Sequence, residues 1–256
     1  MTEKTAIVTG AARGIGLATA KLFALEGRRV AMIDRDEAAL ASAAVEVEHA
    51  LAITCDVSDP EQVAQMAGQV ETAFGRVDAL VNNAGVALFG PIHDMDFATW
   101  REVMGTNLDG VFLCSQAATP ALIKSKGAIV NIASISGLRA STLRVAYGTS
   151  KAAVIQLTKQ QAIELGEHGV RANCVAPGPV ATKLAMAVHT PEIIAAYHGA
   201  IPLNRYGVEN EIAEAILFLC SDKASYVTGQ VLAADGGFDC SGVGLPALRG
   251  ESSPDA

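Results

Sequence analysis

The 256-residue sequence lacks any long apolar run and any excess of positive charge. Its first residues, MTEKTAIVTGAARG, reach glycines after a short strand-like run, too short for a signal peptide or a membrane span. Lysine and arginine number 19 against 27 acidic residues, and the net charge of -8 argues against binding to nucleic acid or to an anionic membrane. We therefore expect a soluble, cytoplasmic protein whose partners are small molecules or copies of itself.

The sequence also lacks cysteine spacings that bind metals or mark redox pairs. Its five cysteines are scattered without a CxxC pattern, which favours reduced and mostly buried thiols and predicts neither a disulfide nor a structural metal: Cys55, Cys114, Cys174, Cys220 and Cys240. Only 18% of the residues are charged, whereas half are hydrophobic and 24 are glycine. This composition fits a compact globular α/β protein better than a disordered or fibrous one.

Short apolar runs alternate with stretches of helical period along most of the chain. Strands are predicted at 5–9, 29–34, 51–56, 78–83, 127–134, 170–177 and 230–235, and helices near 14–27, 36–49, 59–75, 97–124, 147–168 and 209–221. Most of these strands are continuously apolar, as expected when helices cover both faces of a parallel sheet. We therefore predict an α/β fold of the Rossmann type: a doubly wound, seven-stranded parallel sheet with helices on both faces.

Two segments fall outside this alternation. Residues 183–207 form a long insertion before the last helix, and a segment of that length is usually functional. The end of the chain, 239–256, is rich in glycine, serine and proline and is expected to be a tail. Because no linker or composition shift divides the rest, residues 1–238 are predicted to form one domain that includes 183–207.

A glycine turn follows the first strand. Gly10, Gly14 and Gly16 are spaced GxxxGxG, which differs from the GxGxxG dinucleotide fingerprint. Such a turn either packs a helix closely on a strand or lets a pyrophosphate rest on the helix N-terminus. Asp34 ends the second strand, where dinucleotide-binding folds place a carboxylate for the ribose hydroxyls, and it favours NAD over NADP. Arg13 and Arg35 weigh against this preference because a guanidinium pairs well with a phosphate.

Tyr147 and Lys151 are one helical turn apart, so their side chains are expected on one helix face. Either the tyrosine packs its ring beside a solvated lysine, or the ammonium lowers the pKa of a phenol that exchanges a proton with a substrate. Ser134 ends the fifth strand and is either a second hydrogen-bond donor to a reacting oxygen or the cap of the following turn.

The chain resembles the short-chain dehydrogenase/reductase family over nearly its whole length. The resemblance is carried by several motifs in the order and spacing of that family: TGAARGIG (9–16), Asp34, CDVSD (55–59), NNAG (82–85), TNLDGVF (106–112), NIASISG (131–137), YGTSK (147–151) and NCVAPGPVATKL (173–184). It implies a hydride transfer between NAD and a secondary alcohol or ketone. It also implies a homotetramer, with 183–207 as a lid over the substrate.

The resemblance further implies roles for individual residues. In the catalytic group, Tyr147 would be the acid/base, Ser134 would orient the substrate oxygen, Lys151 would lower the tyrosine pKa and bind ribose, and Asn107 would hold a water. The residues that would bind the cofactor are Gly10, Arg13, Gly14, Ile15, Gly16, Asp34, Asp56, Val57, Asn83, Ala84, Gly85, Tyr147, Lys151, Pro177, Gly178, Val180 and Thr182. Asn83 and Asn107 also have a purely structural interpretation.

The substrate stays open at this stage. Arg144, three residues before Tyr147, is either an anchor for an anionic substrate or a surface arginine, and Ser136 and Met186 would help to shape a modest pocket. Polyols, sugars, short hydroxy acids and hydroxy sulfonates all fit these residues. Two alternatives compete with this interpretation: an NADPH-dependent 3-oxoacyl carrier-protein reductase, which Asp34 disfavours, and a silent nucleotide sensor, which would commonly lose the tyrosine or the lysine.

Overall fold

The computed structural model describes residues 3–183, 186 and 189–242, and its centre is a seven-stranded sheet. The strands lie in the order β3-β2-β1-β4-β5-β6-β7, and every neighbouring pair is parallel. Their bounds are β1 Thr5–Thr9, β2 Arg29–Asp34, β3 Leu51–Thr54, β4 Ala79–Asn82, β5 Ala128–Ile132, β6 Arg171–Pro177 and β7 Val231–Ala234. The predicted seven-stranded parallel sheet is confirmed.

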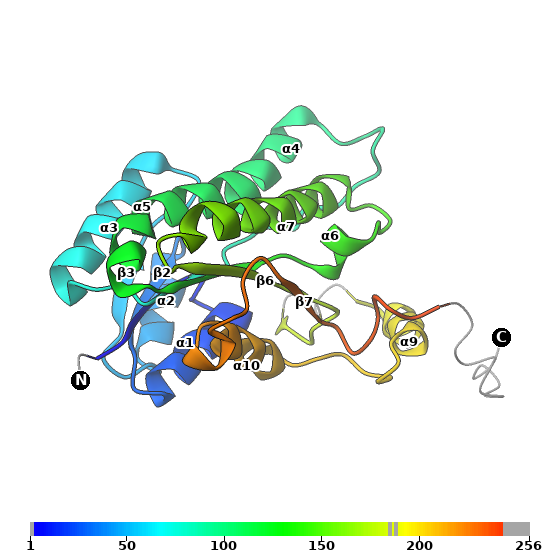
Figure 1. Ribbon diagram of the computed structural model, residues 1–256. Coiled ribbons are helices and arrows are strands. Elements are labelled where there is room, and N and C mark those ends of the chain that lie inside the picture. The colour runs from blue at the N-terminus through cyan, green and yellow to red at the C-terminus, as the bar shows by residue number, and fades with distance from the viewer. Residues whose placement is uncertain (1–2, 184–185, 187–188, 243–256) are drawn as a thin grey trace.

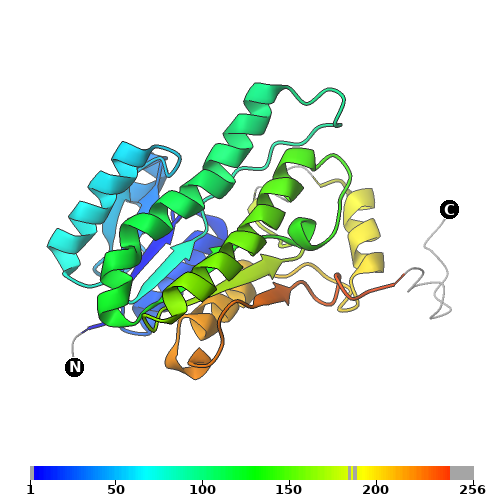
Figure 2. The same cartoon turned by 45° about the horizontal axis from the view of Figure 1, so that its top comes forward.

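Helices cover both faces of the sheet (Figures 1 and 2). The helices α1 (Gly14–Leu25), α2 (Glu37–Ala44) and α10 (Glu209–Leu219) share a buried apolar cluster with one face. The helices α3 (Pro60–Phe74), α5 (Gly110–Ser125) and α7 (Val145–Gly166) share a second cluster with the opposite face. A parallel sheet with an apolar layer on each side needs strands that are apolar throughout, which explains the continuous apolar runs in the sequence.

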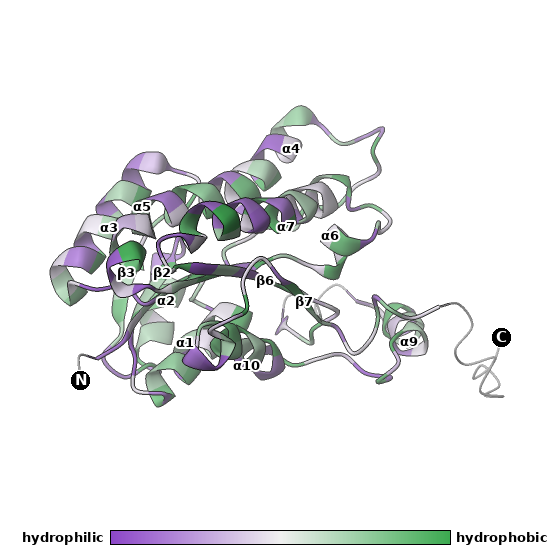
Figure 3. Ribbon diagram, viewed as in Figure 1, coloured by the Kyte–Doolittle hydropathy of each residue, from purple (hydrophilic) through white to green (hydrophobic). Residues whose placement is uncertain are grey.

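The helices α3, α5 and α7 each carry both apolar and polar residues, as their alternating colours show in Figure 3. In α3 the buried residues Val63, Met66 and Val70 recur at helical spacing. Asp59 caps this helix by accepting the N–H groups of residues 61 and 62, and Gly75 ends it in the left-handed conformation with φ +66°. Local sequence signals therefore set both ends of this helix.

Two predicted segments differ from the structure. The single helix expected at 97–124 is divided into α4 (Phe97–Met104), a π-helical turn η1 (Gly105–Asp109) and α5. The π turn buries Asn107, whose side chain bonds to backbone and side-chain groups outside the helix, and helical periodicity cannot reveal such contacts. Within 183–207 the structure contains the helix α9 (Pro191–Ala200), which begins with a Thr190 cap and a proline in its first turn.

Two short elements complete the fold: α6 (Ile135–Leu138) directly after β5 and the 3-10 turn η2 (Asp222–Ala224) after α10. The helices α6 and α9 lie at the end of the sheet where β5, β6 and β7 finish (Figure 1). Of the predicted tail, 239–256, residues 243–256 lie outside the described residues. In the part of the chain that the structure describes, no helix is long and apolar enough to cross a membrane.

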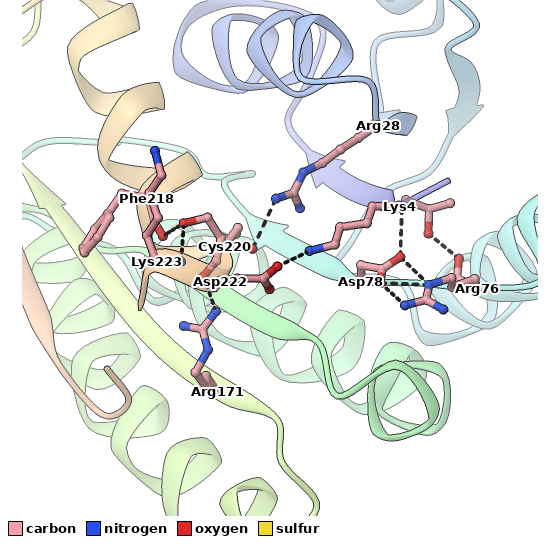
Figure 4. Close-up of polar contacts among 11 residues, drawn as sticks. Lys4, Arg28, Arg76, Asp78, Arg171, Phe218, Cys220, Asp222 and Lys223 are labelled. Carbon is pink, nitrogen blue, oxygen red and sulfur yellow. Dashed lines mark hydrogen bonds and ion pairs between the residues drawn. The ribbon is translucent and has the colours of Figure 1, made fainter. Parts of the chain in front are cut away.

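Polar contacts join the chain segments at the opposite, amino-terminal edge of the sheet (Figure 4). Asp78 accepts the first backbone N–H of β1 at 2.9 Å and the Arg76 guanidinium at 2.6 Å. Arg171 donates to the Leu219 carbonyl at 2.8 Å, and Arg28 donates to the Cys220 carbonyl at 3.3 Å. Because these arginines cap the C-terminal end of α10, where the helix dipole is negative, we interpret this edge as structural.

Candidate active site

The carboxyl ends of the parallel strands bring most of the predicted site residues to one edge. Gly10 follows β1, Asp34 ends β2, Asn83 follows β4, Ser134 follows β5 and Pro177 ends β6. Open α/β sheets bind ligands at this edge, most often where the strand order reverses. Here the reversal falls between β1 and β4, which are neighbours in the sheet although β2 and β3 separate them in the chain.

At Gly10 and Gly16, the glycine turn after β1 has no room for larger side chains. Gly10 has φ +64°, and a Cβ added to Gly16 would lie 2.1 Å from the Gly10 carbonyl oxygen. The helix α1 then begins at Gly14 without a side-chain cap and without an acidic residue in its first turn. Its first N–H groups therefore point out of the helix with a partial positive charge. This uncapped N-terminus beside a bare glycine turn fits the pyrophosphate of a dinucleotide.

The Asp34 carboxylate is held by two backbone groups. One oxygen accepts the Ala12 N–H at 3.0 Å, and the other accepts the Asp36 N–H at 3.1 Å. A carboxylate has about four lone-pair positions, so two remain for the hydroxyls of a ribose. The structure thus fixes Asp34 next to the glycine turn, as the sequence predicted.

The loop after β4 is fastened to the glycine turn. The Asn83 amide donates to the carbonyls of Thr9 at 2.9 Å and Gly10 at 3.1 Å, and Thr9 Oγ1 accepts the N–H of Ala84 at 3.0 Å. A Cβ on Gly10 would lie 2.8 Å from the Ala84 Cα. Asn83 therefore holds two strand ends together, which gives its structural interpretation direct support.

Tyr147 and Ser134 meet across the space between α7 and the end of β5. Their side chains share a hydrogen bond. Burial raises the pKa of the Tyr147 phenol, whereas the hydrogen bond with Ser134 and the positive charge of Arg144 lower it. Ser134 also accepts the Ser136 N–H at 3.1 Å, so it caps α6 as well as facing the tyrosine. Both sequence interpretations of Ser134 are therefore compatible with its position.

Lys151 lies behind the tyrosine and is almost completely buried. Its Nζ donates to the Ile132 carbonyl at 2.7 Å and lies 5.8 Å from the centre of the Tyr147 ring. Burial lowers the pKa of Lys151 to about 8. The groups that lower the tyrosine pKa in this structure are Ser134 and Arg144. The role predicted for Lys151, to lower that pKa and to bind ribose, stays a prediction.

Asn107 is fully buried in the π turn η1. Its Oδ1 accepts the Val86 N–H at 2.8 Å, and its Nδ2 donates to the Val86 carbonyl and to Ser150 Oγ, both at 3.0 Å. A Cβ on Gly85 would lie 3.2 Å from Asn107 Oδ1 and 3.5 Å from Lys151 Nζ. Asn107 therefore joins the loop after β4 to helix α7, close to the lysine.

The remaining predicted cofactor residues flank the same edge. Gly178 follows β6, where a Cβ would lie 2.7 Å from the Asp235 Cα, and Val180 forms an isolated bridge with Gly207. Thr182 follows and donates its backbone N–H to the Val180 carbonyl at 2.8 Å. On the other side, Val57 is buried, and Asp56 accepts the N–H of residue 58 at 2.9 Å. Ile15 packs partly buried against the core from α1.

Arg144 is at the mouth of the site, immediately before α7. Its guanidinium carbon lies 4.4 Å from the centre of the Phe89 ring and 5.9 Å from that of Tyr147. The Phe89 and Tyr147 rings meet edge to face at 6.1 Å. Arg144 thus lies beside Phe89 and Tyr147. Of the other two substrate candidates, Ser136 is buried beside Ser134, and the Met186 side chain is 44% exposed.

An aromatic cluster in residues 189–206, which the sequence pattern did not indicate, lies next to Phe238, which follows β7. His189 stacks on Tyr197 at 5.6 Å and hydrogen-bonds to the Tyr206 hydroxyl at 3.0 Å. Tyr197 packs against Phe238, just after β7, at 5.8 Å. Burial lowers the pKa of His189, and the nearby positive charge of Arg144 lowers it further. The available signal was that residues 189–206 hold two of the four tyrosines and two of the five histidines of the chain.

The chain was compared with known proteins. A family model described as enoyl-(acyl carrier protein) reductase matches residues 10–239. A galactitol 2-dehydrogenase (L-tagatose-forming) of Cereibacter sphaeroides is 44% identical over 91% of this chain and 94% of its own. A 3-oxoacyl-[acyl-carrier-protein] reductase of Staphylococcus aureus is 40% identical over 91% and 97%. The crystal structure of gox2181 superposes with a TM-score of 0.90 at 35% identity, covering 94% of this chain and 97% of that one.

The Rossmann-type sheet, the glycine turn and the tyrosine-lysine-serine group define a nicotinamide-dependent oxidoreductase that acts on CH–OH groups. Together with matches that cover about nine-tenths of the chain, they place it in one family. The protein belongs to the short-chain dehydrogenase/reductase family.

Proposed function

We propose that the protein is an NAD-dependent dehydrogenase that interconverts a small secondary alcohol and its ketone. The substrate is a polyol, a sugar, or a short hydroxy acid or hydroxy sulfonate. The observation that carries this proposal is the hydrogen-bonded pair of Tyr147 and Ser134, with Lys151 one helical turn behind. A phenol and a serine hydroxyl that face the same space can both reach one substrate oxygen.

In the direction of alcohol oxidation, the Tyr147 phenolate accepts the hydroxyl proton of the substrate. Ser134 donates a hydrogen bond to the same substrate oxygen and keeps it within reach of the tyrosine. Arg144 lowers the pKa of Tyr147 and so favours the phenolate. Lys151 binds ribose hydroxyls, and Asn107 holds the backbone that positions the lysine.

The bound nicotinamide would take up the hydride from the carbinol carbon during oxidation and return it during reduction. The glycine turn at 10–16 and the uncapped start of α1 hold the pyrophosphate, and Asp34 accepts the ribose hydroxyls. Because a carboxylate at this position repels a 2′-phosphate, NAD is preferred over NADP. Asp56 and Val57 contact the adenine, and residues 177–182 contact the nicotinamide carboxamide.

The second candidate is an NADPH-dependent 3-oxoacyl carrier-protein reductase. It is favoured by the 40% identity to the Staphylococcus aureus enzyme of that name and by the description of the matching family model. Asp34 argues against it because its carboxylate repels the 2′-phosphate of NADPH. The preference between NADH and NADPH therefore separates the two candidates.

We further propose that residues 1–238 form the dehydrogenase domain, with 183–207 as the substrate lid and 239–256 as a tail. The active form is a cytoplasmic homotetramer. Exposed apolar side chains on α4 and α5, Phe97 and Phe112, support an interface between subunits.

The proposed function is tested by measuring NADH and NADPH formation from polyols, sugars, simple secondary alcohols, and hydroxy acids and sulfonates. Tyr147→Phe serves as the blank for each substrate. Turnover of one of these alcohols with NAD supports the proposal. Turnover confined to NADPH and 3-oxoacyl thioesters would replace it with the reductase.

A further inference from the structure

A ring of polar contacts closes around the Asp34 carboxylate. The two oxygens of Asp34 accept the backbone N–H groups of Ala12 and Asp36. The residue after Ala12 is Arg13, and its guanidinium forms an ion pair with the Asp36 side chain. Arg13 therefore lies beside the position of the ribose 2′-hydroxyl but is directed to a second carboxylate.

We propose that Asp36 is a second determinant of cofactor selection, which acts by holding Arg13 in an ion pair. A cofactor with a 2′-phosphate needs a cation near Asp34, because Asp34 itself repels the phosphate. Arg13 is well placed for that role, and the ion pair withholds it. This inference rests on the NAD preference proposed above and adds a second residue to it.

The Asp36 side chain is itself fixed in place. It caps helix α2: Oδ1 accepts the Ala39 N–H at 3.1 Å, while Oδ2 receives the guanidinium of Arg13. The hydrogen bond from Arg13 is the main cause that lowers the pKa of Asp36, and the Ala39 N–H lowers it further. The carboxylate is thus charged at neutral pH, and each of its oxygens has a separate partner.

The size of the effect follows from exposure. The Arg13 side chain is 65% exposed and that of Asp36 is 44% exposed, so water and salt weaken the pair. A 2′-phosphate that competes with Asp36 for Arg13 therefore breaks only a weak ion pair. We therefore expect Asp36 to change the affinity for a 2′-phosphate by about 2- to 5-fold, and not to switch the cofactor alone.

Arg35 is the competing source of positive charge. It is exposed, and it makes no ion pair in the part of the chain that the structure describes. If Asp36 acts by holding Arg13, substitution of Asp36 has no effect on 2′-phosphate binding once Arg13 has been removed. If Arg35 is the arginine involved, the effect of substituting Asp36 persists without Arg13.

The test measures binding without turnover, by calorimetry with adenosine 2′,5′-bisphosphate and adenosine 5′-phosphate. The variants are Asp36→Asn, Arg13→Ala and the double variant, each made in the Asp34→Ala background so that the 2′-phosphate can enter. An asparagine still accepts the Ala39 N–H and preserves the cap. Asp96→Asn, which changes the cap of α4 in the same way, is the matched control.

We expect Asp36→Asn to tighten binding of the bisphosphate about 2- to 5-fold, to leave binding of the monophosphate unchanged, and to have no such effect once Arg13 is alanine. A gain of equal size with and without Arg13 would overturn the proposal, as would no gain. The ratio of NADP to NAD turnover in the wild type tests the proposed NAD preference by itself. The two proposals can therefore fail separately.

Discussion

Removal of the Tyr147 hydroxyl is the most direct perturbation of the proposed chemistry. In Tyr147→Phe the ring is retained, so its edge-to-face contact with Phe89 and its proximity to Lys151 are preserved. Only the hydroxyl and its hydrogen bond with Ser134 are lost. We therefore expect stability to fall by no more than ~1 kcal/mol, the typical net contribution of one hydrogen bond.

The expected loss of turnover is much larger. A positioned general acid/base contributes roughly 10²- to 10⁴-fold to the rate, so kcat should fall by at least ~10²-fold, or about 2.7 kcal/mol of activation free energy. The dissociation constant for NADH, measured by fluorescence, should change little, because the glycine turn and Asp34 are untouched.

The assay is steady-state NADH formation with the best substrate of the panel, and Tyr226→Phe is the matched control because the Tyr226 side chain is fully exposed. Alcohol oxidation needs the phenolate, and burial raises the Tyr147 pKa, so the wild-type rate should rise with pH across the neutral range. A Tyr147→Phe variant that keeps turnover within ~10-fold of the wild type would refute the assigned role.

Three further substitutions test other parts of the site. Gly16→Ala places a Cβ 2.1 Å from the Gly10 carbonyl oxygen and should weaken cofactor binding at least ~10-fold. The control Gly68→Ala in α3 places a Cβ with no atom within 4 Å and should not weaken it. Equal cofactor binding by both variants would contradict this expectation. Arg144→Met should shift the pH profile of oxidation to higher pH, since the charge of Arg144 lowers the Tyr147 pKa. It should also raise KM for anionic substrates alone if Arg144 anchors them. A pH profile that does not move would show that the Arg144 charge does not act on Tyr147. The wild type should gain stability relative to Lys151→Met as pH rises from about 8 to 10.5, because the unfolded chain binds more protons than the folded chain in that window. Melting temperatures of the two proteins that change in parallel with pH would contradict the lowered pKa of Lys151.

The sheet and the glycine turn could be predicted because their signals are local. The run TAIVT and the glycine turn after it specify β1 and the start of α1, whatever the rest of the chain does. The spacing of Tyr147 and Lys151 is likewise local, since one helical turn separates them. Helix ends were less well defined, because capping contacts set them: the helix predicted from residue 36 begins at Glu37, with Asp36 as its cap.

The π turn at Asn107 could not be predicted, because its cause lies far away in the chain. The Asn107 side chain bonds to Val86 and to Ser150, which are 21 and 43 residues distant. The helix α9 was missed for a related reason. It buries none of its residues fully, so it has no apolar stripe of core residues to reveal it.

The sequence by itself determined the α/β class, the order of the strands and helices, and the residue types that the chemistry requires, because these follow from periodicity and from motifs of a few residues. The tertiary structure alone decided which charges face one another. It directs Lys151 to the Ile132 carbonyl, brings Arg144 to Phe89 beside Tyr147, and pairs Arg13 with Asp36. Electrostatic contacts depend on distances of a few ångströms between residues far apart in the chain, and only folding fixes those distances.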